Sequence, residues 1–175
     1  MIELLILYVL LKRDLTMYAV QKHINENFEP YTKPSFGAIK PALRRLEENG
    51  FITSRKMLSD GGKLSIFYTI SKLGKEELKR LLLEDMSENP LQFLSNARIK
   101  LSCAGVLDFE ERKRLFFNIK SLAMQHKFNT ENMLNDEYNQ YNFYQKIILD
   151  NALCEYKNFA AIIEGLEKDN ARNSK

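Results

Sequence analysis

The sequence predicts a mainly α-helical protein with one small β-hairpin. Apolar residues recur at helical spacing through most of the 175 residues, and two short β-like runs flank the turn sequence SDGGK. Near residue 85 the pattern changes, because short elements separated by Pro, Gly and Asp give way to longer helical stretches. We therefore predict two domains, at residues 1–83 and 84–175.

Apolar spacing predicts the first two helices. Residues 4–11 are apolar at most positions, as expected of a buried helix. Thr16 is a suitable N-cap for the second helix, since its hydroxyl can accept a hydrogen bond from the first helical turn. Apolar residues then recur at helical spacing at Met17, Val20 and Ile24.

A third helix and the hairpin follow the loop NFEPYTKPS. We expect the helix within residues 35–50 and the strands at residues 52–58 and 64–70. Gly61 and Gly62 lie between the strands, and glycine adopts the positive φ of a tight turn at little cost. The order helix, helix, helix, hairpin is that of a winged helix-turn-helix domain.

The third helix, in SFGAIKPALRRLEENGFI, has two different faces at about 100° per residue. The apolar face, expected to lie in the core, consists of Phe36, Ile39, Leu43 and Leu46. The opposite face consists of Gly37, Pro41, Arg44 and Glu48, with Lys40 and Arg45 on its flanks. A basic face with small side chains suits a helix in the major groove of DNA, because Lys and Arg can then reach bases or phosphates.

Pro41 interrupts the hydrogen bonding of this helix, since proline lacks a backbone N–H and crowds the carbonyl four residues earlier. That carbonyl belongs to Gly37, which leaves room for local adjustment. We expect a slight bend and a flat surface toward the groove. Gly50 is expected to follow the end of the helix as its C′ residue.

Positive charge collects in the first half of the chain. Residues 1–83 hold 14 Lys and Arg against 9 Asp and Glu, a net charge of +5, whereas residues 84–175 carry −2. This asymmetry favours a nucleic-acid partner, although an ordinary mixed surface also explains it. Arg44 and Arg45 could likewise only pair with nearby glutamates, but the hairpin that follows them favours DNA.

The segment PSFGAIKPALRRLEENGFI and the later YTISKLG resemble the PadR family of bacterial transcriptional regulators. The matching residues are Gly37, Ile39, Pro41, Ala42, Leu43, Leu46, Glu47, Gly50, Ile52, Tyr68, Ile70, Ser71 and Gly74. The resemblance implies a sequence-specific transcriptional regulator that binds double-stranded DNA. We expect a repressor, although the sequence leaves repression and activation both open. The third helix would lie in the major groove, and the wing would lie on the backbone or minor groove.

Departures from the family pattern limit what the resemblance implies. Ala38 and Lys40 stand where the family usually has Thr and Tyr, and Leu64, Ser65 and Ile66 stand where basic residues are common in the wing. The resemblance therefore implies DNA binding but no particular operator sequence. We expect the wing to contribute less than usual.

Residues on the second helix, the loop after it, the third helix and the wing are expected to contact DNA. They are Tyr18, Lys33, Ser35, Gly37, Ala38, Lys40, Pro41, Arg44, Arg45, Arg55, Lys56 and Lys63. Two interpretations of Tyr18 stay open. Its hydroxyl could donate to a phosphate, or its ring could be half-buried and pack on the helix pair.

Capping signals mark helices in the second half. Ser71 is the expected N-cap of a helix that leaves the hairpin, and Asp108 with Glu111 forms a capping-box pattern. The segment FLSNARIKLSCAGVLDFEER resembles the helical C-terminal dimerisation region of larger PadR members similar to virulence activators. The second half is therefore expected to be an α-helical dimerisation domain.

The last helix is expected to run from about residue 129 to residue 168. A helix of ~40 residues is ~60 Å long and outreaches a small domain, so its apolar seam needs a partner. The simplest partner is a second copy of the chain, and a homodimer could read an inverted-repeat operator. The expected interface residues are Leu134, Tyr138, Tyr141, Ile148, Ala152, Phe159, Ile163 and Leu166.

The sequence does not suggest catalysis, a cofactor or a metal. His23 and His126 are isolated, so each is expected to be a surface or interface histidine. Cys103 and Cys154 match no zinc or redox spacing, and their apolar neighbours predict that both are buried. We predict a non-enzymatic protein, and a cytoplasmic one because no apolar run approaches the ~20 residues of a membrane span.

Two other functions stay open. The aromatic stretch YNQYNFYQK, with Tyr138, Tyr141, Phe143 and Tyr144, could line a pocket for an aromatic or drug-like effector, although helix packing also explains it. The thin wing is also compatible with a protein-interaction module that has lost DNA binding.

Overall fold

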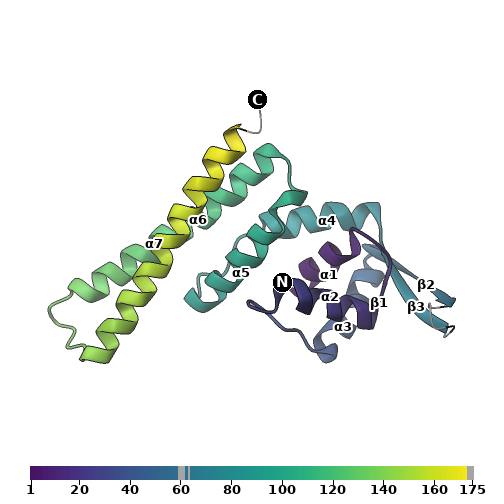
Figure 1. The fold of residues 1–175 in the computed structure, drawn as a ribbon, viewed down its shortest axis with the longest axis horizontal. Coiled ribbons are helices and arrows are strands. Elements are labelled where there is room, and N and C mark those ends of the chain that lie inside the picture. Colours follow the sequence, from purple (N-terminus) through teal and green to yellow (C-terminus); the bar gives the residue numbers. More distant parts are fainter. Residues whose placement is uncertain (59–61, 63, 173–175) are drawn as a thin grey trace. The chain divides into compact units, whose positions relative to one another are not determined.

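The computed structural model describes residues 1–58, 62 and 64–172, and it is mainly helical with one small sheet, as predicted (Figure 1). Within the described residues, no helix is both long and apolar enough to cross a membrane. The elements in chain order are α1 (Ile2–Leu10), β1 (Leu15–Thr16), α2 (Met17–Phe28), α3 (Phe36–Glu48), β2 (Ile52–Leu58), β3 (Leu64–Ile70), α4 (Lys72–Leu83), α5 (Pro90–Ser102), the 3-10 turn η1 (Ala104–Val106), α6 (Phe109–Asn135) and α7 (Phe143–Arg172).

The chain forms two compact units. Unit 1 comprises Met1–Glu84 and Leu94–Val106, and unit 2 comprises Asp85–Phe93 and Leu107–Lys175. Unit 1 therefore contains the whole predicted winged domain together with most of α5. The helix α5 contributes residues to both units.

α1 forms the centre of unit 1. Six of its nine residues are buried: Leu4, Leu5, Ile6, Leu7, Val9 and Leu10. A helix that is apolar on nearly all sides must be covered on nearly all sides. α2, α3, α4 and β3 each contact α1 and provide this cover. Fully burying one such side chain stabilises the fold by about 1.5–3 kcal/mol.

The predicted helices α2 and α3 are present, with the predicted start of α2 and the predicted end of α3. Thr16 caps α2, because its Oγ1 accepts a hydrogen bond from the Ala19 N–H at 3.3 Å. Gly50 follows α3 with φ of 72°, which confirms it as the C′ residue. The residues that α3 buries are Ile39, Ala42, Leu43 and Leu46.

The expectation that Phe36 lies in the core is wrong. Its side chain is 39% exposed, at the first turn of α3. Instead of entering the core, the ring stacks on the exposed ring of Tyr18 from α2, with the centroids 6.2 Å apart. Helical spacing identified the correct side of α3 but could not show where along the helix the core ends.

The sheet has the strand order β1-β3-β2 and is antiparallel throughout. β2 and β3 have the predicted bounds and form the hairpin, in which Ile52 pairs with Ile70 and Leu58 with Leu64. Gly62 has φ of 73°, in agreement with the predicted turn, and Gly61 lies outside the described residues. The sequence did not predict β1, since two residues are too few to show alternation.

Gly74 allows α4 to pack closely against the start of the hairpin. Ser71 caps α4 as predicted, since its Oγ accepts from the Gly74 N–H at 3.0 Å and donates to the Gly50 carbonyl at 2.7 Å. A Cβ on Gly74 would lie 2.0 Å from the carbonyl oxygen of Phe51. That oxygen is backbone, so it cannot move aside as a flexible side chain would.

We expect Gly74→Ala to destabilise the protein by about 2 kcal/mol or more, because the added methyl forces α4 away from the Phe51 carbonyl. Urea unfolding followed by circular dichroism measures this. Gly105→Ala is the matched control, since a Cβ there meets nothing within 4 Å. Equal unfolding midpoints for the two variants would contradict the close packing at Gly74.

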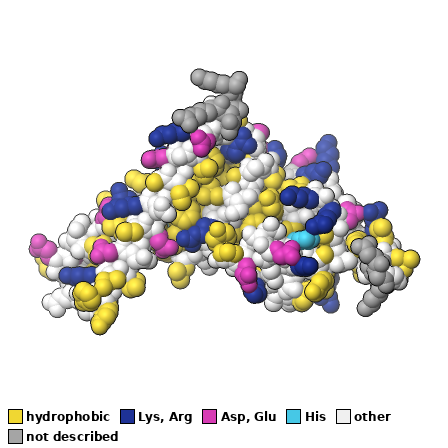
Figure 2. Space-filling model, in the orientation of Figure 1, with side chains coloured by type: hydrophobic (Ala, Val, Ile, Leu, Met, Phe, Trp, Pro, Cys, Tyr) yellow, Lys and Arg dark blue, Asp and Glu magenta, His cyan; other side chains and the backbone are white. Residues whose placement is uncertain are grey.

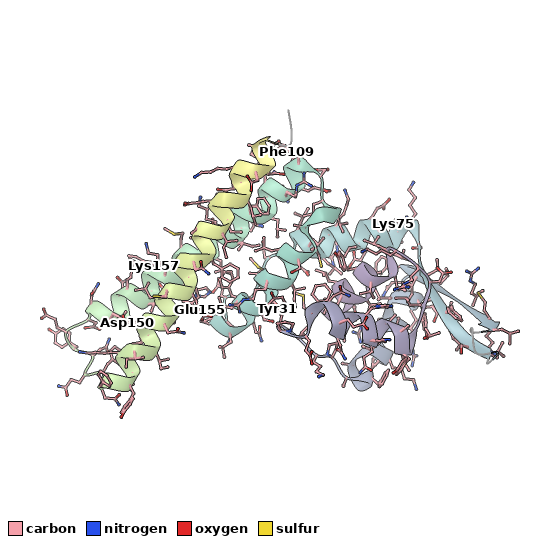
Figure 3. The ribbon with its side chains drawn as sticks, in the orientation of Figure 1. Tyr31, Lys75, Phe109, Asp150, Glu155 and Lys157 are labelled. Atoms are coloured by element: carbon pink, nitrogen blue, oxygen red, sulfur yellow. The ribbon has the colours of Figure 1, made fainter. Side chains whose placement is uncertain are left out.

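Unit 2 is built around an antiparallel hairpin of α6 and α7 (Figure 1). Cross-helix pairs show the direction, because Lys120 contacts Glu167 at 3.1 Å while Glu131 contacts Lys157 at 3.6 Å. Lys157 projects from the middle of α7 (Figure 3). Asp108 and Glu111 form the predicted capping box at the start of α6.

The predicted single helix over residues 129–168 is wrong, because the chain turns between Asn135 and Phe143. Local hydrogen bonds of short polar side chains end α6 and begin α7. The Tyr138 N–H donates to Asp136 Oδ1 at 3.0 Å. Asn142 and Gln145 then exchange hydrogen bonds of 2.9 and 3.0 Å, so that α7 begins with a capping box.

His126 is buried in unit 2, which corrects the expectation of a surface or interface histidine. Its ring lies 5.3 Å from that of Tyr156 and 5.1 Å from that of Phe93. Burial lowers its pKa below the ordinary value, and the Glu88 carboxylate opposes this only in part. Nε2 is buried and has no hydrogen-bond partner among the described residues, so the neutral ring is favoured here.

The two cysteines differ in environment. Cys103 is buried as predicted, and burial raises the pKa of its thiol to about 12. Cys154 is exposed, so the prediction for it is wrong. Its apolar sequence neighbours lie on other sides of α7, since adjacent residues of a helix point about 100° apart.

Candidate nucleic-acid interface

The outward face of α3 is basic and combines small residues with long cationic side chains. Its residues at the predicted positions are exposed: Gly37, Ala38, Lys40, Pro41, Arg44 and Arg45. The buried side of the same helix packs in unit 1 beside α1. The fold therefore uses the apolar side of α3 and leaves the basic side to solvent.

Pro41 lies inside α3 without ending it. Because Pro41 lacks an N–H, the Gly37 carbonyl loses its usual intrahelical donor. Both residues are exposed, so this carbonyl faces solvent and its loss of a partner costs little.

The fold itself does not require glycine at position 37. A Cβ there would meet only Ser35 Oγ, at an ordinary 3.6 Å, and Gly37 is not among the glycines with positive φ. Glycine inside a helix costs about 0.5–1 kcal/mol relative to alanine. Glycine here leaves room for adjustment at the carbonyl that Pro41 crowds, and it also permits close approach by another molecule.

Tyr18 lies in the first turn of α2 and is 67% exposed. It is therefore not half-buried, and the second interpretation of this residue is wrong in that respect. Its ring stacks on Phe36, which joins the first turns of α2 and α3 at the surface. An exposed hydroxyl beside α3 agrees with the interpretation that it donates to a phosphate.

Several candidate cations already have carboxylate partners in the protein. Arg44 Nε lies 2.7 Å from Glu48 Oε1, one turn further along α3. Hydrogen bonding to Glu48 raises the pKa of Arg44. Arg45 pairs with Glu3 of α1 at 2.8 Å. The pairing of these arginines with glutamates, left open by the sequence, is thus present, but both arginines remain exposed.

Two further pairs involve candidate cations outside α3. Lys33 Nζ lies 2.6 Å from Glu29 Oε1, and this hydrogen bond lowers the pKa of Glu29. Arg55 of β2 pairs with Asp14, which precedes β1. No described residue forms an ion pair with Lys40, which is exposed on α3.

The described strands of the wing carry two cations and several apolar side chains. Arg55 lies opposite Phe67 on β3, and Lys56 lies opposite Ile66. Lys63, predicted to contact DNA, lies outside the described residues. The exposed apolar residues of the wing are Met57, Leu58, Leu64 and Ile66.

The sequence left open that Arg44 and Arg45 pair with nearby glutamates, but it did not identify Glu3 and Asp14 as partners. The spacing of four residues between Arg44 and Glu48 was a visible signal for one pair. Glu3 and Asp14 lie more than forty residues from their partners in the sequence, so no local pattern marks them. Within the described ranges, no group of three or more His, Cys, Asp or Glu residues could hold a metal ion.

Comparisons with known proteins place the first half of the chain in a family. The model of the "Transcriptional regulator PadR-like family" matches residues 6–80, which include α2, α3 and the hairpin. No curated protein matches the chain.

Solved structures resemble the chain over different lengths. Bacillus subtilis PadR in complex with operator DNA is 21% identical, with coverage of 96% of this chain and 98% of PadR and a TM-score of 0.43. The same protein in complex with p-coumaric acid is 21% identical, with coverage of 97% and 98% and a TM-score of 0.40. TA0346 from Thermoplasma acidophilum is 31% identical over 44% of this chain and 72% of its own, with a TM-score of 0.39.

Proposed function

Because the chain belongs to the PadR-like family of transcriptional regulators, we propose that it binds double-stranded DNA sequence-specifically, with α3 in the major groove. The observation that carries this proposal is the outward face of α3, where Lys40, Pro41 and Arg44 are exposed while the apolar side is buried. This family consists of regulators, so the prediction of a non-enzymatic protein is confirmed by membership. Bacillus subtilis PadR has been solved with operator DNA, which supports the same role here.

On such a face, phosphate contacts contribute most of the affinity and base contacts contribute the sequence specificity. Each phosphate that Lys or Arg neutralises releases counterions, so affinity falls steeply as salt rises. Lys33 in the loop before α3, Arg45 on the flank of α3 and the wing cations Arg55 and Lys56 are exposed, and we assign them to phosphates. Arg44 lies on the outward face of α3, where a base edge can be reached, and a good base contact is worth about 1–3 kcal/mol.

Homodimerisation through unit 2 would place two copies of α3 on one operator. Exposed hydrophobic side chains gather over the first turns of α7 (Figure 2), including Phe143, Tyr144, Ile147 and Ile148. Of the predicted interface residues, Phe159 and Ile163 already pack inside the protomer, so we restrict the proposed interface to the exposed members and their neighbours. Two α3 helices ~34 Å apart could read an inverted repeat. A dimer bound across a promoter would act as a repressor.

We expect Arg44→Ala to weaken binding to the best-bound genomic fragment by about five- to a hundredfold, since a base or phosphate contact of about 1–3 kcal/mol is lost. Fluorescence anisotropy measures the affinity, and analytical ultracentrifugation should give an unchanged oligomeric state. Unchanged affinity would contradict the placement of Arg44 at the DNA.

Gly37→Ala should change stability and DNA affinity in opposite directions. The free protein has room for the methyl, so we expect a gain of about 0.5–1 kcal/mol in stability from the better helix propensity. DNA affinity should fall, because the methyl holds the duplex away from α3. Thermal unfolding and anisotropy measure the two effects, and an affinity equal to that of the wild type would contradict close approach at Gly37.

Ile148→Asp tests the interface. Ile148 is 68% exposed in the protomer, so the change should leave each chain folded. We expect monomers in analytical ultracentrifugation, since a buried carboxylate at an interface costs more than the interface can offset. Lys146→Gln is the control, because it makes the same change in net charge at an exposed position on the opposite side of α7. A persistent Ile148→Asp dimer would exclude this surface.

Binding of an aromatic effector is a second candidate function. A shallow apolar depression on unit 2 is lined by Tyr141, Tyr144, Gln145, Ile148 and Leu149. Bacillus subtilis PadR has been solved with p-coumaric acid, which supports the same ligand class. Gel shifts with genomic fragments, including the promoter of the chain's own gene, should show release of DNA when an effector of this class is added. Failure to bind any fragment would favour a protein-interaction module instead.

A further inference from the structure

The outward face of α3 carries one acidic residue close to its central cation. Glu48 follows Arg44 by one helical turn, and the two side chains are joined at 2.7 Å. Both are well exposed, at 80% and 56% of their side-chain surface. A DNA strand that approaches Arg44 therefore also approaches the Glu48 carboxylate.

Glu48 opposes DNA binding in two ways. Arg44 must leave its carboxylate partner before it can bind DNA fully, and the carboxylate repels phosphates, which occur at one charge per about 1.7 Å of duplex. A pair could also help by holding Arg44 in one rotamer, but this helps only if the pair survives in the complex with DNA. Exposed pairs of this kind are weak, so both the ordering of Arg44 and the competition for it are small. Repulsion between the Glu48 carboxylate and the phosphates adds to the competition, so the two effects that oppose binding exceed the one that helps it.

We propose that Glu48 is a specificity-determining residue of the α3 surface, which keeps Arg44 occupied except where DNA offers it a well-oriented contact. The inference rests on the proposed DNA-binding function. On non-operator DNA, Arg44 gains only a screened phosphate contact, whose free energy hardly exceeds that of the lost ion pair with Glu48. On the operator, Arg44 gains an oriented contact, so Glu48 reduces non-specific binding more than specific binding.

Glu48 differs from the other acidic partners in this respect. Glu3 and Asp14 are only 30% and 29% exposed, and their pairs join elements that are distant in sequence, so they also hold the fold together. Glu48 pairs within α3 alone. Its removal should leave the structure unchanged and affect the charge of the surface.

The test measures two affinities of Glu48→Gln by fluorescence anisotropy in the full chain. One duplex is the best-bound genomic fragment, and the other is a random-sequence duplex of equal length. We expect affinity for random DNA to rise roughly two- to fivefold and affinity for the genomic fragment to rise less, so that the specificity ratio falls. Glu110→Gln is the control, because Glu110 is an exposed partner of Lys113 in unit 2 and carries the same charge. This control should leave the ratio unchanged.

The same two affinities, measured in an Arg44→Gln background, distinguish competition for Arg44 from simple repulsion between the Glu48 carboxylate and DNA. Glu48→Gln should then change the ratio much less, because there is no arginine to release. The role of Glu48 is overturned if Glu48→Gln has the same specificity ratio as Glu110→Gln. It is also overturned if Glu48→Gln lowers the specificity ratio as much in the Arg44→Gln background as in the wild type. In both cases the proposed function still stands, provided that the wild type binds the genomic fragment better than random DNA. If the wild type binds no fragment better than random DNA, the proposed function and this inference both fail.

Discussion

The burial of α1 is the constraint on which unit 1 depends. Six of its nine residues are buried, so α2, α3, α4 and β3 must all pack against it. α3 can do so only with its apolar side, and its basic side is therefore directed outward. The Gly74 backbone fits against the Phe51 carbonyl and fixes the start of α4 at the base of the hairpin. The surface that we assign to DNA is thus mainly a consequence of core packing, to which the surface contacts of Tyr18, Arg45 and Arg55 add.

Charge on this surface is balanced and not simply positive. Lys33, Arg44, Arg45 and Arg55 each contact a carboxylate of the same chain. Exposed pairs contribute little to stability, about 0–1 kcal/mol each. A DNA contact must nevertheless exceed this free energy before it can displace the carboxylate from the cation. Lys40 and Lys56 have no such partner among the described residues, so both cations are available for a first encounter with DNA. The paired cations and their carboxylates therefore influence both the affinity for DNA and the selectivity between DNA sequences.

The sequence predicted the elements of unit 1 well, because local signals determine them. Thr16, Ser71 and Gly50 act as caps where expected, and both hairpin strands have the predicted bounds. The turn between α6 and α7 was missed because it contains no Gly or Pro. The Asn142 and Gln145 capping box was visible in the sequence, but the apolar seam that crosses it favoured one long helix. The partners Glu3 and Asp14 could not be predicted, since only the folded chain brings them to Arg45 and Arg55.

Placement of α3 in the major groove is tested most directly by methylation interference at guanine N7, which lies in that groove. The DNA is the genomic fragment that the wild-type chain binds best. We expect methylated guanines to block binding in two clusters about one helical turn apart, as two copies of α3 require. Binding that tolerates methylation at every guanine N7, yet is blocked by methylation of adenine N3 in the minor groove, would contradict this placement.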